Sequence, residues 1–468
     1  MAIRMATLEH ALTALSDIEA ALGPSAVRYG QAVGALDPGW NAENLNAGFM
    51  AMPASTAEVA EIVKICAGLE VPLVPQGGRT GLVGGAVSRP GEIVLSLERM
   101  NRIERVDPYE RVAVVEAGVT LYDLQAAAAP FGLEPGIDLA ARGSATLGGM
   151  ASTNAGGIMA FRYGVMRHQI LGLEAVLPGG GVYSDMTRVL KSASGYDLKH
   201  LLIGAEGTLG IVTRLALSLE PKPLATTTAL IALPSIAAAL AAVDLALRLG
   251  SLRAAEALWR AFLQINAAGQ GFRDPTLDET YPIYLLLAFG GRDEAALRES
   301  VEALYVELAA RFPDISGIIA ESEKQARELW RLREDTHTIY RVFPAAPSYD
   351  VSVPLSQIEA YALRVERGAK QLGLTPYIFG HLADGNLHIL FGHAGPFPRA
   401  LAALVDELLY EGISALGGAF SAEHGVGSKR IASLYATADP GKLALMRDLK
   451  RMIDPKTLFN PGKVLVPA

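Results

Sequence analysis

A glycine-rich stretch near the start of the chain constrains its fold more than any other feature. Residues 72–87, PLVPQGGRTGLVGGAV, run from a short apolar strand at Pro72–Pro75 into a loop that has five glycines within nine positions. Such a loop lets backbone N–H groups approach a ligand closely, and successive inward-pointing amides form a nest for anions. The spacing matches neither a P-loop nor a Rossmann fingerprint. The stretch predicts a phosphate or pyrophosphate ligand, and a surface loop without a ligand is the alternative.

A second cluster of small residues lies at 143–157, GSATLGGMASTNAGG. Its glycines are accompanied by hydroxyl and amide side chains, namely Ser144, Thr146, Ser152, Thr153 and Asn154. These groups can add hydrogen bonds to phosphate oxygens or to the edge of a ring. Two such loops in one domain favour a long ligand with two different ends.

Composition narrows the class of protein. The 468 residues suffice for two or three domains with large cores, and 50% hydrophobic with 19% charged residues is an ordinary globular mixture. A formal net charge of −8 without a basic run argues against a nucleic-acid partner. The single cysteine, Cys66, excludes disulfides and cysteine-ligated clusters, and its place on the apolar face of a predicted helix indicates a buried thiol.

The first half of the chain alternates helices and strands. Ser55 and Glu58 form a predicted capping box ahead of the helix that carries Cys66. A further helix is predicted at 120–129 with Thr120 as its N-cap. Strands are predicted at 92–97, 112–117, 173–177, 182–184 and 211–219. The third and fourth of these strands form a predicted hairpin, and the last is predicted as an edge or half-buried strand.

A proline-rich segment at 220–223 marks a predicted domain boundary. Beyond it, strands are predicted at about 226–233, 282–289, 348–353, 376–380 and 386–391, and helices at about 235–249, 293–311, 322–340 and 355–372. This mixture predicts one antiparallel sheet with helices on one face. A last helix is predicted at 439–453, ahead of the terminal NPGK.

Two histidines flank a predicted hairpin turn in GHLADGNLHI. If Asp384-Gly385 is a two-residue turn, His381 and His388 lie directly opposite one another on one face of the sheet, with Cβ atoms roughly 5 Å apart. Two imidazoles placed in this way could hold one metal ion, and a pair of solvated histidines is the alternative. Glu423, followed by His424 in SAEHGVG, supplies a carboxylate if the chain returns to the hairpin. Such a ligand set suits Zn, Mn or Fe(II) and does not choose among them.

Arg333, in LWRLRE, lies on a predicted helix. A guanidinium can hold a carboxylate through two parallel hydrogen bonds. The alternative is a surface arginine that pairs with Glu328 or Glu334.

The motifs together resemble the FAD-binding domain of the vanillyl-alcohol oxidase and p-cresol methylhydroxylase superfamily. The strings that carry the resemblance are PQGGRTGLVGG, PGIDLAARGSATLGGMASTNAGG, SGYDLKHLLIGAEGTLGIVT and NPGK. In the second half, GHLADGNLHI and SAEHGVG are similar to the D-2-hydroxyacid dehydrogenase branch, which includes D-2-hydroxyglutarate and D-lactate dehydrogenases and the FAD subunit of glycolate oxidase.

The resemblance implies an α+β fold with a two-part FAD-binding domain at 1–222, an antiparallel-sheet-and-helix cap domain for substrate and metal at 223–425, and a C-terminal segment at 426–468 that returns to the FAD domain. It implies non-covalent FAD, because the first loop has Arg79-Thr80 where a histidine attachment point would stand and Cys66 is predicted to be buried. The implied FAD contacts are Pro75, Gln76, Gly77, Gly78, Thr80, Gly81, Thr146, Gly148, Gly149, Ser152, Gly156, Glu206, Gly207, Ile211 and Asn460.

In the same branch, the metal positions correspond to His381, His388 and Glu423, and the substrate anchor corresponds to Arg333. His424 is then available for acid/base work, since an imidazole titrates near neutrality. Three positions depart from the pattern of 2-hydroxyglutarate dehydrogenases, where threonine, lysine and asparagine are typical: here they are His337, Ser348 and Leu390. Without the lysine and the asparagine, a charge and an amide that could hold a second carboxylate are missing. This departure favours a monoacid, or a differently substituted 2-hydroxyacid, over a glutarate-sized diacid.

The resulting hypothesis is FAD-dependent, metal-assisted oxidation of a D-2-hydroxyacid to the 2-oxoacid, by hydride transfer to flavin N5 with His424 as the base. Electrons would pass to a non-nicotinamide acceptor such as an electron-transfer flavoprotein, a quinone or a cytochrome. An oxidase that uses O₂ is the close alternative. A metal hydrolase leaves both glycine loops unexplained, and a flavoprotein electron-transfer subunit would need no metal.

The sequence also bears on location and partners. The stretch from Met1 to Gly23 has the charge pattern of an amphipathic helix and not of a signal peptide, and the longest aliphatic stretch is too short to span a bilayer. We therefore expect a cytoplasmic protein with a small-molecule substrate and no transmembrane segment, for which a homodimer is one candidate state.

Overall fold

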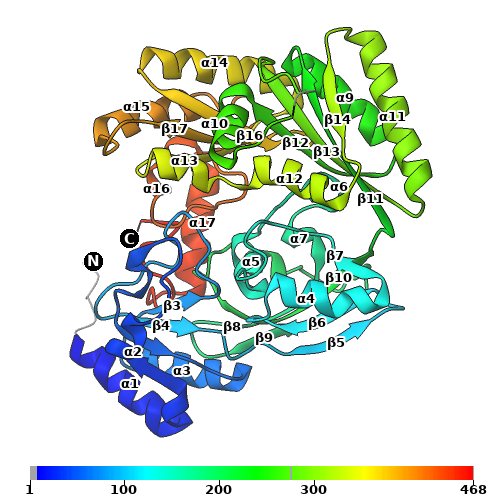
Figure 1. Ribbon diagram of the computed structural model, residues 1–468. Coiled ribbons are helices and arrows are strands. Elements are labelled where there is room, and N and C mark those ends of the chain that lie inside the picture. The colour runs from blue at the N-terminus through cyan, green and yellow to red at the C-terminus, as the bar shows by residue number, and fades with distance from the viewer. Residues whose placement is uncertain (1–7, 275–276, 467–468) are drawn as a thin grey trace. The chain divides into compact units, whose positions relative to one another are not determined.

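The computed structural model describes residues 8–274 and 277–466, which form two compact units (Figure 1). The first unit comprises the described residues up to Gly157, then Tyr163–Lys222, and then the described residues from Glu423 onwards. The second unit comprises Ile158–Arg162 and the described part of Pro223–Ala422. The chain therefore leaves the first unit to build the second and returns to finish the first.

A four-stranded sheet in the first unit positions the first glycine loop. Its strands, in spatial order, are β1 (Val27–Tyr29), β2 (Phe49–Ala51), β4 (Ile93–Ser96) and β3 (Leu73–Gln76). The pairs β2–β4 and β3–β4 are parallel. Two helices, α1 (Leu8–Leu22) and α3 (Thr56–Gly68), pack their apolar residues into one core with this sheet. The N-cap half of the predicted capping box is confirmed, since Ser55 Oγ accepts a hydrogen bond from Glu58 N at 3.2 Å. The Glu58 side chain instead accepts a hydrogen bond from Ala54 N at 2.7 Å. Cys66 is fully buried, as predicted.

The second sheet of this unit is antiparallel and carries the other small-residue cluster. Its strands are β5 (Ile103–Asp107), β6 (Val112–Glu116), β10 (Ile211–Pro221), β8 (Ile170–Val176) and β9 (Val182–Asp185), with β7 (Leu133–Pro135) also paired to β10. Thr120 caps α4 (Leu121–Ala128), and β8 and β9 form the expected hairpin. The prediction of an edge strand at 211–219 was wrong. Strand β10 is the centre of the sheet and is buried over most of its length because β6 and β8 pair with its two sides.

The second unit is built on a seven-stranded antiparallel sheet. In spatial order its strands are β14 (Ser316–Ile319), β11 (Ala225–Leu233), β13 (Ile283–Gly291), β12 (Leu252–Trp259), β16 (Thr375–His381), β17 (Asn386–Gly392) and β15 (Ser348–Ser352). The sequence patterns did not predict β12, β14 or the helix α10 (Arg260–Gln270) that follows β12.

Helices cover both faces of this sheet, so the prediction of helices on one face was wrong (Figure 1). On one face lie α9 (Ile236–Arg248), α11 (Glu294–Arg311), α14 (Ile358–Gln371) and α15 (Arg399–Tyr410). On the other face lie α10, α12 (Glu323–Glu334) and α13 (His337–Val342). The central strands are apolar on both sides, as in Ile283–Leu287, which is fully buried throughout, and each apolar face needs a cover.

The hairpin between β16 and β17 has a different register from the predicted one. His381 pairs with Asn386 and Phe379 pairs with His388, so four residues, Leu382–Gly385, form the loop instead of two. Within this loop, the Asp384 side chain accepts a hydrogen bond from Asn386 N at 3.2 Å. The shift is by an even number of residues, so His381 and His388 are diagonal neighbours and keep the same face of the sheet.

The C-terminal segment completes the first unit. After α16 (Ile431–Thr437) and α17 (Pro440–Ile453), the chain reaches Asn460, whose N–H donates to the carbonyl of Leu73 at 2.8 Å. The remaining helices are α2 (Gln31–Gly34), α5 (Leu147–Thr153), α6 (Ala160–Tyr163), α7 (Met166–Gln169) and α8 (Lys199–Leu202). Over the residues that the structure describes, none of the helices combines the length and the apolar composition needed to cross a membrane.

Candidate functional site

A cavity of about 330 Å³ lies within the first unit, in the size range of small-molecule and cofactor sites. Its lining comes from separate parts of the chain: the first glycine loop, Leu97, the segment 139–157 that contains the second small-residue cluster, the stretch 206–212, Glu423 with His424, and Asn460. Every residue that the sequence predicts to contact FAD lines this cavity. The two clusters that were separate in the sequence therefore belong to one site.

Backbone packing requires glycine where the two clusters meet. A Cβ on Gly78 would fall on the backbone carbonyl of Ser144, and a Cβ on Gly77 would fall on the hydroxyl of Thr146. Thr146 itself caps α5 by accepting a hydrogen bond from Gly149 N at 3.3 Å. The loops are thus held together by contacts that leave no room for a side chain.

Two buried amide side chains line the cavity with part of their hydrogen-bonding capacity unused. The Nδ2 group of Asn460 donates to the carbonyls of Gly85 and Glu206, and the Nε2 group of Gln76 donates to those of Asn44 and Ala86. No partner for Asn460 Oδ1 or Gln76 Oε1 is found among the described residues, although both side chains are only 2% exposed. A buried acceptor without a donor is costly, so these oxygens fit a ligand that presents N–H groups, as an isoalloxazine or adenine ring does.

Glu206 is the most deeply buried acid of the cavity wall. Its Oε1 accepts a hydrogen bond from Val426 N at 2.7 Å and its Oε2 accepts one from Gly427 N at 2.8 Å. Burial raises the pKa of Glu206, while the two N–H donors and nearby Lys463 act in the opposite direction.

Glu423 and His424 line the same cavity and belong to the same unit. The carboxylate of Glu423 lies against the backbone of Gly156, where a Cβ would stand 2.5 Å from Glu423 Oε1. The acid and the imidazole that the sequence predicts for chemistry are therefore part of the wall formed by the glycine loops.

The predicted histidine pair lies in the second unit, on the sheet face covered by α10, α12 and α13. The imidazoles of His381 and His388 are nearly perpendicular, with ring centroids 5.4 Å apart, and their residues are 5% and 8% exposed. The solvated alternative is therefore wrong. The predicted closeness is confirmed, although the two histidines are diagonal and not directly opposite.

A buried carboxylate orients His381 and Arg333 together. Glu256, on β12, lies 2.6 Å from His381 Nδ1 through Oε1 and accepts a hydrogen bond from Arg333 Nε at 2.6 Å through Oε2. Its side chain is fully buried. Burial alone would raise the pKa of Glu256, but His381 and Arg333 together hold it below its usual value.

Arg333 is not a surface residue, so its predicted alternative pairing with Glu328 or Glu334 was wrong. It is 8% exposed, and its guanidinium lies 4.6 Å above the ring of Phe379. With Nε engaged by Glu256, the terminal nitrogens are the groups with which it could bind a carboxylate.

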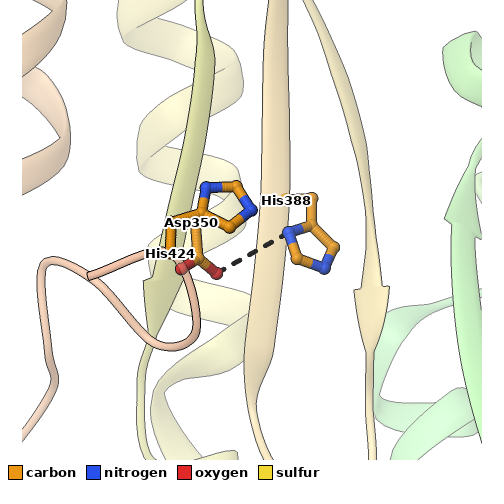
Figure 2. Close-up of side chains that lie close together, drawn as sticks. All are labelled: Asp350, His388 and His424. Atoms are coloured by element: carbon orange, nitrogen blue, oxygen red, sulfur yellow. Dashed lines mark ion pairs between the residues drawn. The ribbon is translucent and has the colours of Figure 1, made fainter. Parts of the chain in front are cut away.

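Asp350 lies beside His388 as Glu256 lies beside His381. Asp350 and His388 are register partners on β15 and β17. Figure 2 shows the ion pair between Asp350 Oδ1 and His388 Nδ1, at 3.6 Å. The same carboxylate accepts hydrogen bonds from Asn386 Nδ2 at 2.7 Å and from Ala422 N at 3.0 Å. Each histidine of the pair therefore has a carboxylate beside Nδ1.

Comparison with known proteins identifies the chain. Residues 47–185 match the FAD binding domain family, and residues 222–464 match the family of FAD linked oxidases, C-terminal domain. The second match alone covers more than half of the chain. The chain belongs to the family of FAD-linked oxidases.

Relatives in this family are similar over most of their length. D-2-hydroxyglutarate dehydrogenase of Xanthomonas citri pv. viticola is 37% identical over 434 residues, which cover 89% of this chain and 88% of that protein. The mitochondrial D-2-hydroxyglutarate dehydrogenase of Arabidopsis thaliana is 35% identical over 89% of this chain and 74% of its own. The solved structure of p-cresol methylhydroxylase shares the fold, with a TM-score of 0.76 and 20% identity over 98% of this chain and 97% of its own. The resemblance drawn from the motifs is confirmed, and so is the α+β fold class.

The donor set of the second unit also fits a metal. Histidines that bind a metal through one ring nitrogen usually donate the other to a carboxylate or carbonyl, which fixes the ring. His381 has Glu256 at Nδ1 and His388 has Asp350 at Nδ1, so Nε2 of each ring would be the ligand atom.

Sequence reasoning missed Glu256 and Asp350. A single acid in the apolar run LRAAEALW was a usable signal, because a lone carboxylate in a buried strand needs a partner. For Asp350, the signal was its place in the middle of a predicted strand, SYDVS. In both cases the partner lies on another strand and depends on the register.

Proposed function

We propose that this member of the FAD-linked oxidases is an FAD-dependent, metal-assisted dehydrogenase of D-2-hydroxyacids. The observation that carries the proposal is that Glu423 and His424 line the cavity formed by the two glycine clusters. A carboxylate and an imidazole in the wall of a flavin cavity suit a reaction that removes a proton and a hydride from one substrate. The relatives that are named D-2-hydroxyglutarate dehydrogenases support a 2-hydroxyacid as the substrate.

The residues would divide the work as follows. FAD, when bound, supplies the two-electron acceptor, with the cavity residues named above as its non-covalent binding site. A divalent metal such as Zn, Mn or Fe(II), when held by His381, His388 and Glu423, lowers the pKa of a hydroxyl group beside it. Arg333 would bind the substrate carboxylate through its terminal nitrogens, and His424 would accept the hydroxyl proton.

The proposed substrate class is a D-2-hydroxyacid without a second carboxylate. Ser348 and Leu390 are register partners on β15 and β17, and Leu390 lies two residues beyond His388 on the same face. Leu390 is 2% exposed and belongs to the apolar cluster that includes Tyr377 and Phe379. A second carboxylate near this position would lose water without gaining a charged partner, which costs roughly 1–3 kcal/mol or more.

The test is an anaerobic titration of the purified protein, followed by the visible flavin absorbance. D-lactate and longer aliphatic D-2-hydroxyacids should bleach the band, and the L-acids should not. D-2-hydroxyglutarate should need a concentration about 10- to 100-fold higher, in line with the cost of an unpaired carboxylate. Preference for D-2-hydroxyglutarate would overturn the substrate class, and a yellow protein that no hydroxyacid bleaches would overturn the reaction.

The metal and the base are tested by matched variants. His388→Asn should lose bound metal, measured by elemental analysis, and chelation of the wild type should abolish bleaching. His393→Asn is the control, because His393 follows the same strand but lies beyond its end. His424→Asn should slow flavin reduction by about 10²- to 10⁴-fold while changing the half-saturating substrate concentration much less. If the flavin band is still bleached after chelation, the metal has no part in the reaction and the protein is a flavoprotein without metal-dependent chemistry.

The electron acceptor is proposed to be an electron-transfer flavoprotein, a quinone or a cytochrome, with O₂ as the alternative. Mixing the reduced protein with air-saturated buffer distinguishes a dehydrogenase that uses one of these acceptors from an oxidase that uses O₂. Reoxidation within the turnover time would indicate an oxidase.

A further inference from the structure

The segment Ala422–Gly427 carries Glu423 and His424, and it is the stretch in which the chain passes from the second unit to the first. Its sequence is AEHGVG, and it lies outside every helix and strand of the described residues. Something other than secondary structure must therefore hold the two functional side chains in place.

A buried carboxylate holds the first end of this segment. Asp350, which is 3% exposed, accepts the hydrogen bond from Ala422 N through Oδ2 and the hydrogen bond from Asn386 through Oδ1. Just before this point, Ala419 exchanges two backbone hydrogen bonds with Ser352, of 2.8 and 3.0 Å. The chain is thus fixed beside β15 up to the residue that precedes Glu423.

A second buried carboxylate holds the other end. Glu206 accepts the N–H groups of Val426 and Gly427, one with each oxygen. Gly425 has φ +83°, and a Cβ there would stand 2.8 Å from Glu206 Oε1. A Cβ on Gly427 would fall on the carbonyl of Val83. The glycines of AEHGVG are therefore required by the close approach of the segment to its anchors.

We infer that Asp350 and Glu206 are positioning residues, a pair of carboxylate clamps that hold the two ends of segment 422–427 and so fix Glu423 and His424 for the reaction. Neither clamp needs to touch substrate for this role. Each uses both of its oxygens as acceptors, so an amide in its place would lose one hydrogen bond and turn an N–H donor towards another donor. The inference rests on the proposed function for the roles of Glu423 and His424, but the anchoring itself can be measured without any substrate.

The experiment is hydrogen exchange, read by mass spectrometry on peptides that span residues 418–430, in the FAD-loaded full-length protein. Wild type is compared with Asp350→Asn and Glu206→Gln. Loss of one hydrogen bond of about 1–1.5 kcal/mol should speed exchange in this segment by about tenfold in each variant. Peptides from the rest of the chain should change much less.

Glu116→Gln is the matched control. Glu116 is a buried carboxylate of the first unit that also accepts a backbone N–H, but its partner is Arg102. Its replacement should leave exchange at 418–430 unchanged. If either clamp variant fails to fold, the other carries the test, because the two residues belong to different units.

The second measurement is flavin reduction by a saturating hydroxyacid. Compared at equal amounts of bound flavin, the clamp variants should be reduced about tenfold more slowly than wild type, whereas Glu116→Gln should be reduced at the wild-type rate. Wild-type exchange at 418–430 in both clamp variants would overturn the inference. A wild-type protein that no hydroxyacid reduces would overturn the proposed function and leave the exchange result to decide on the clamps.

Discussion

The cavity of the first unit and the histidine face of the second are formed by different types of residue. The cavity wall is formed mainly by glycine, alanine and hydroxyl residues, with backbone atoms close together where the clusters meet. The histidine face is formed by ionisable side chains at most 8% exposed, namely Glu256, Arg333, Asp350, His381 and His388. We therefore expect added side-chain atoms to impair flavin binding in the cavity. On the histidine face, we expect the loss of one member of an ion pair to lower the stability of the fold.

The largest effect is expected on the histidine face. Glu256→Ala leaves His381 and Arg333 without their shared carboxylate, and breaking a buried pair in this way costs about 3–5 kcal/mol. The free energy of unfolding, measured by urea denaturation, should fall by that amount. Glu302→Ala is the control, since its pair with Arg298 is exposed and should contribute less than about 0.5 kcal/mol. Equal losses in the two variants would contradict the distinction between the regions.

The next effect concerns the cavity. Gly78→Ala places a methyl group on the carbonyl of Ser144, and overpacking of this kind costs about 1–3 kcal/mol. The loop must shift, so we expect a protein that folds but is purified with little flavin absorbance and recovers little on addition of FAD. Gly143→Ala is the control, because no described atom beyond its own residue and its two chain neighbours lies within 4 Å of the position of its Cβ. A Gly78→Ala protein with full flavin content would show that the cavity tolerates added atoms.

The smallest effect is a difference in pH dependence. The pKa of Glu256 is lowered in the folded protein, so below about pH 4.5 the unfolded chain binds a proton that the folded chain does not. Stability should then fall with decreasing pH, by at most about 1.4 kcal/mol per pH unit from this group, until the pH passes below the folded pKa. Glu256→Gln should have a shallower slope over the same range in urea denaturation. If the stability of the two proteins falls equally steeply with pH, the pKa of Glu256 is not lowered by His381 and Arg333.

The same contrast explains what the sequence could predict. Glycine clusters are visible in the sequence itself, and Gly77, Gly78 and Gly148 lie where a Cβ would clash with neighbouring atoms in the cavity wall. The capped helices after Ser55 and Thr120 were predicted for a similar reason, because a cap is a local interaction. Interactions between residues close together in the chain can therefore be predicted from the sequence.

The histidine face was predicted only in part, because its contacts join different strands. His381 and His388 share a short hairpin, so their common face survived an error in the turn. Glu256 comes 125 residues before His381, and only the pairing of β12 with β16 brings them together. The position of β10 was mistaken for the same reason, since the pattern of a strand does not reveal its neighbours on both sides.

The return of the chain to the first unit has a consequence for biosynthesis. Gln76 and Asn460 line one cavity but lie far apart in the sequence. At translation rates of about 5–20 residues per second, tens of seconds separate their emergence from the ribosome. During that interval the nascent chain displays its glycine loops and β3 without the strand-like partner at Phe459 that pairs with Leu73. Capture of the flavin is therefore expected only after the segment that carries Phe459 and Asn460 has left the ribosome and joined the cavity wall.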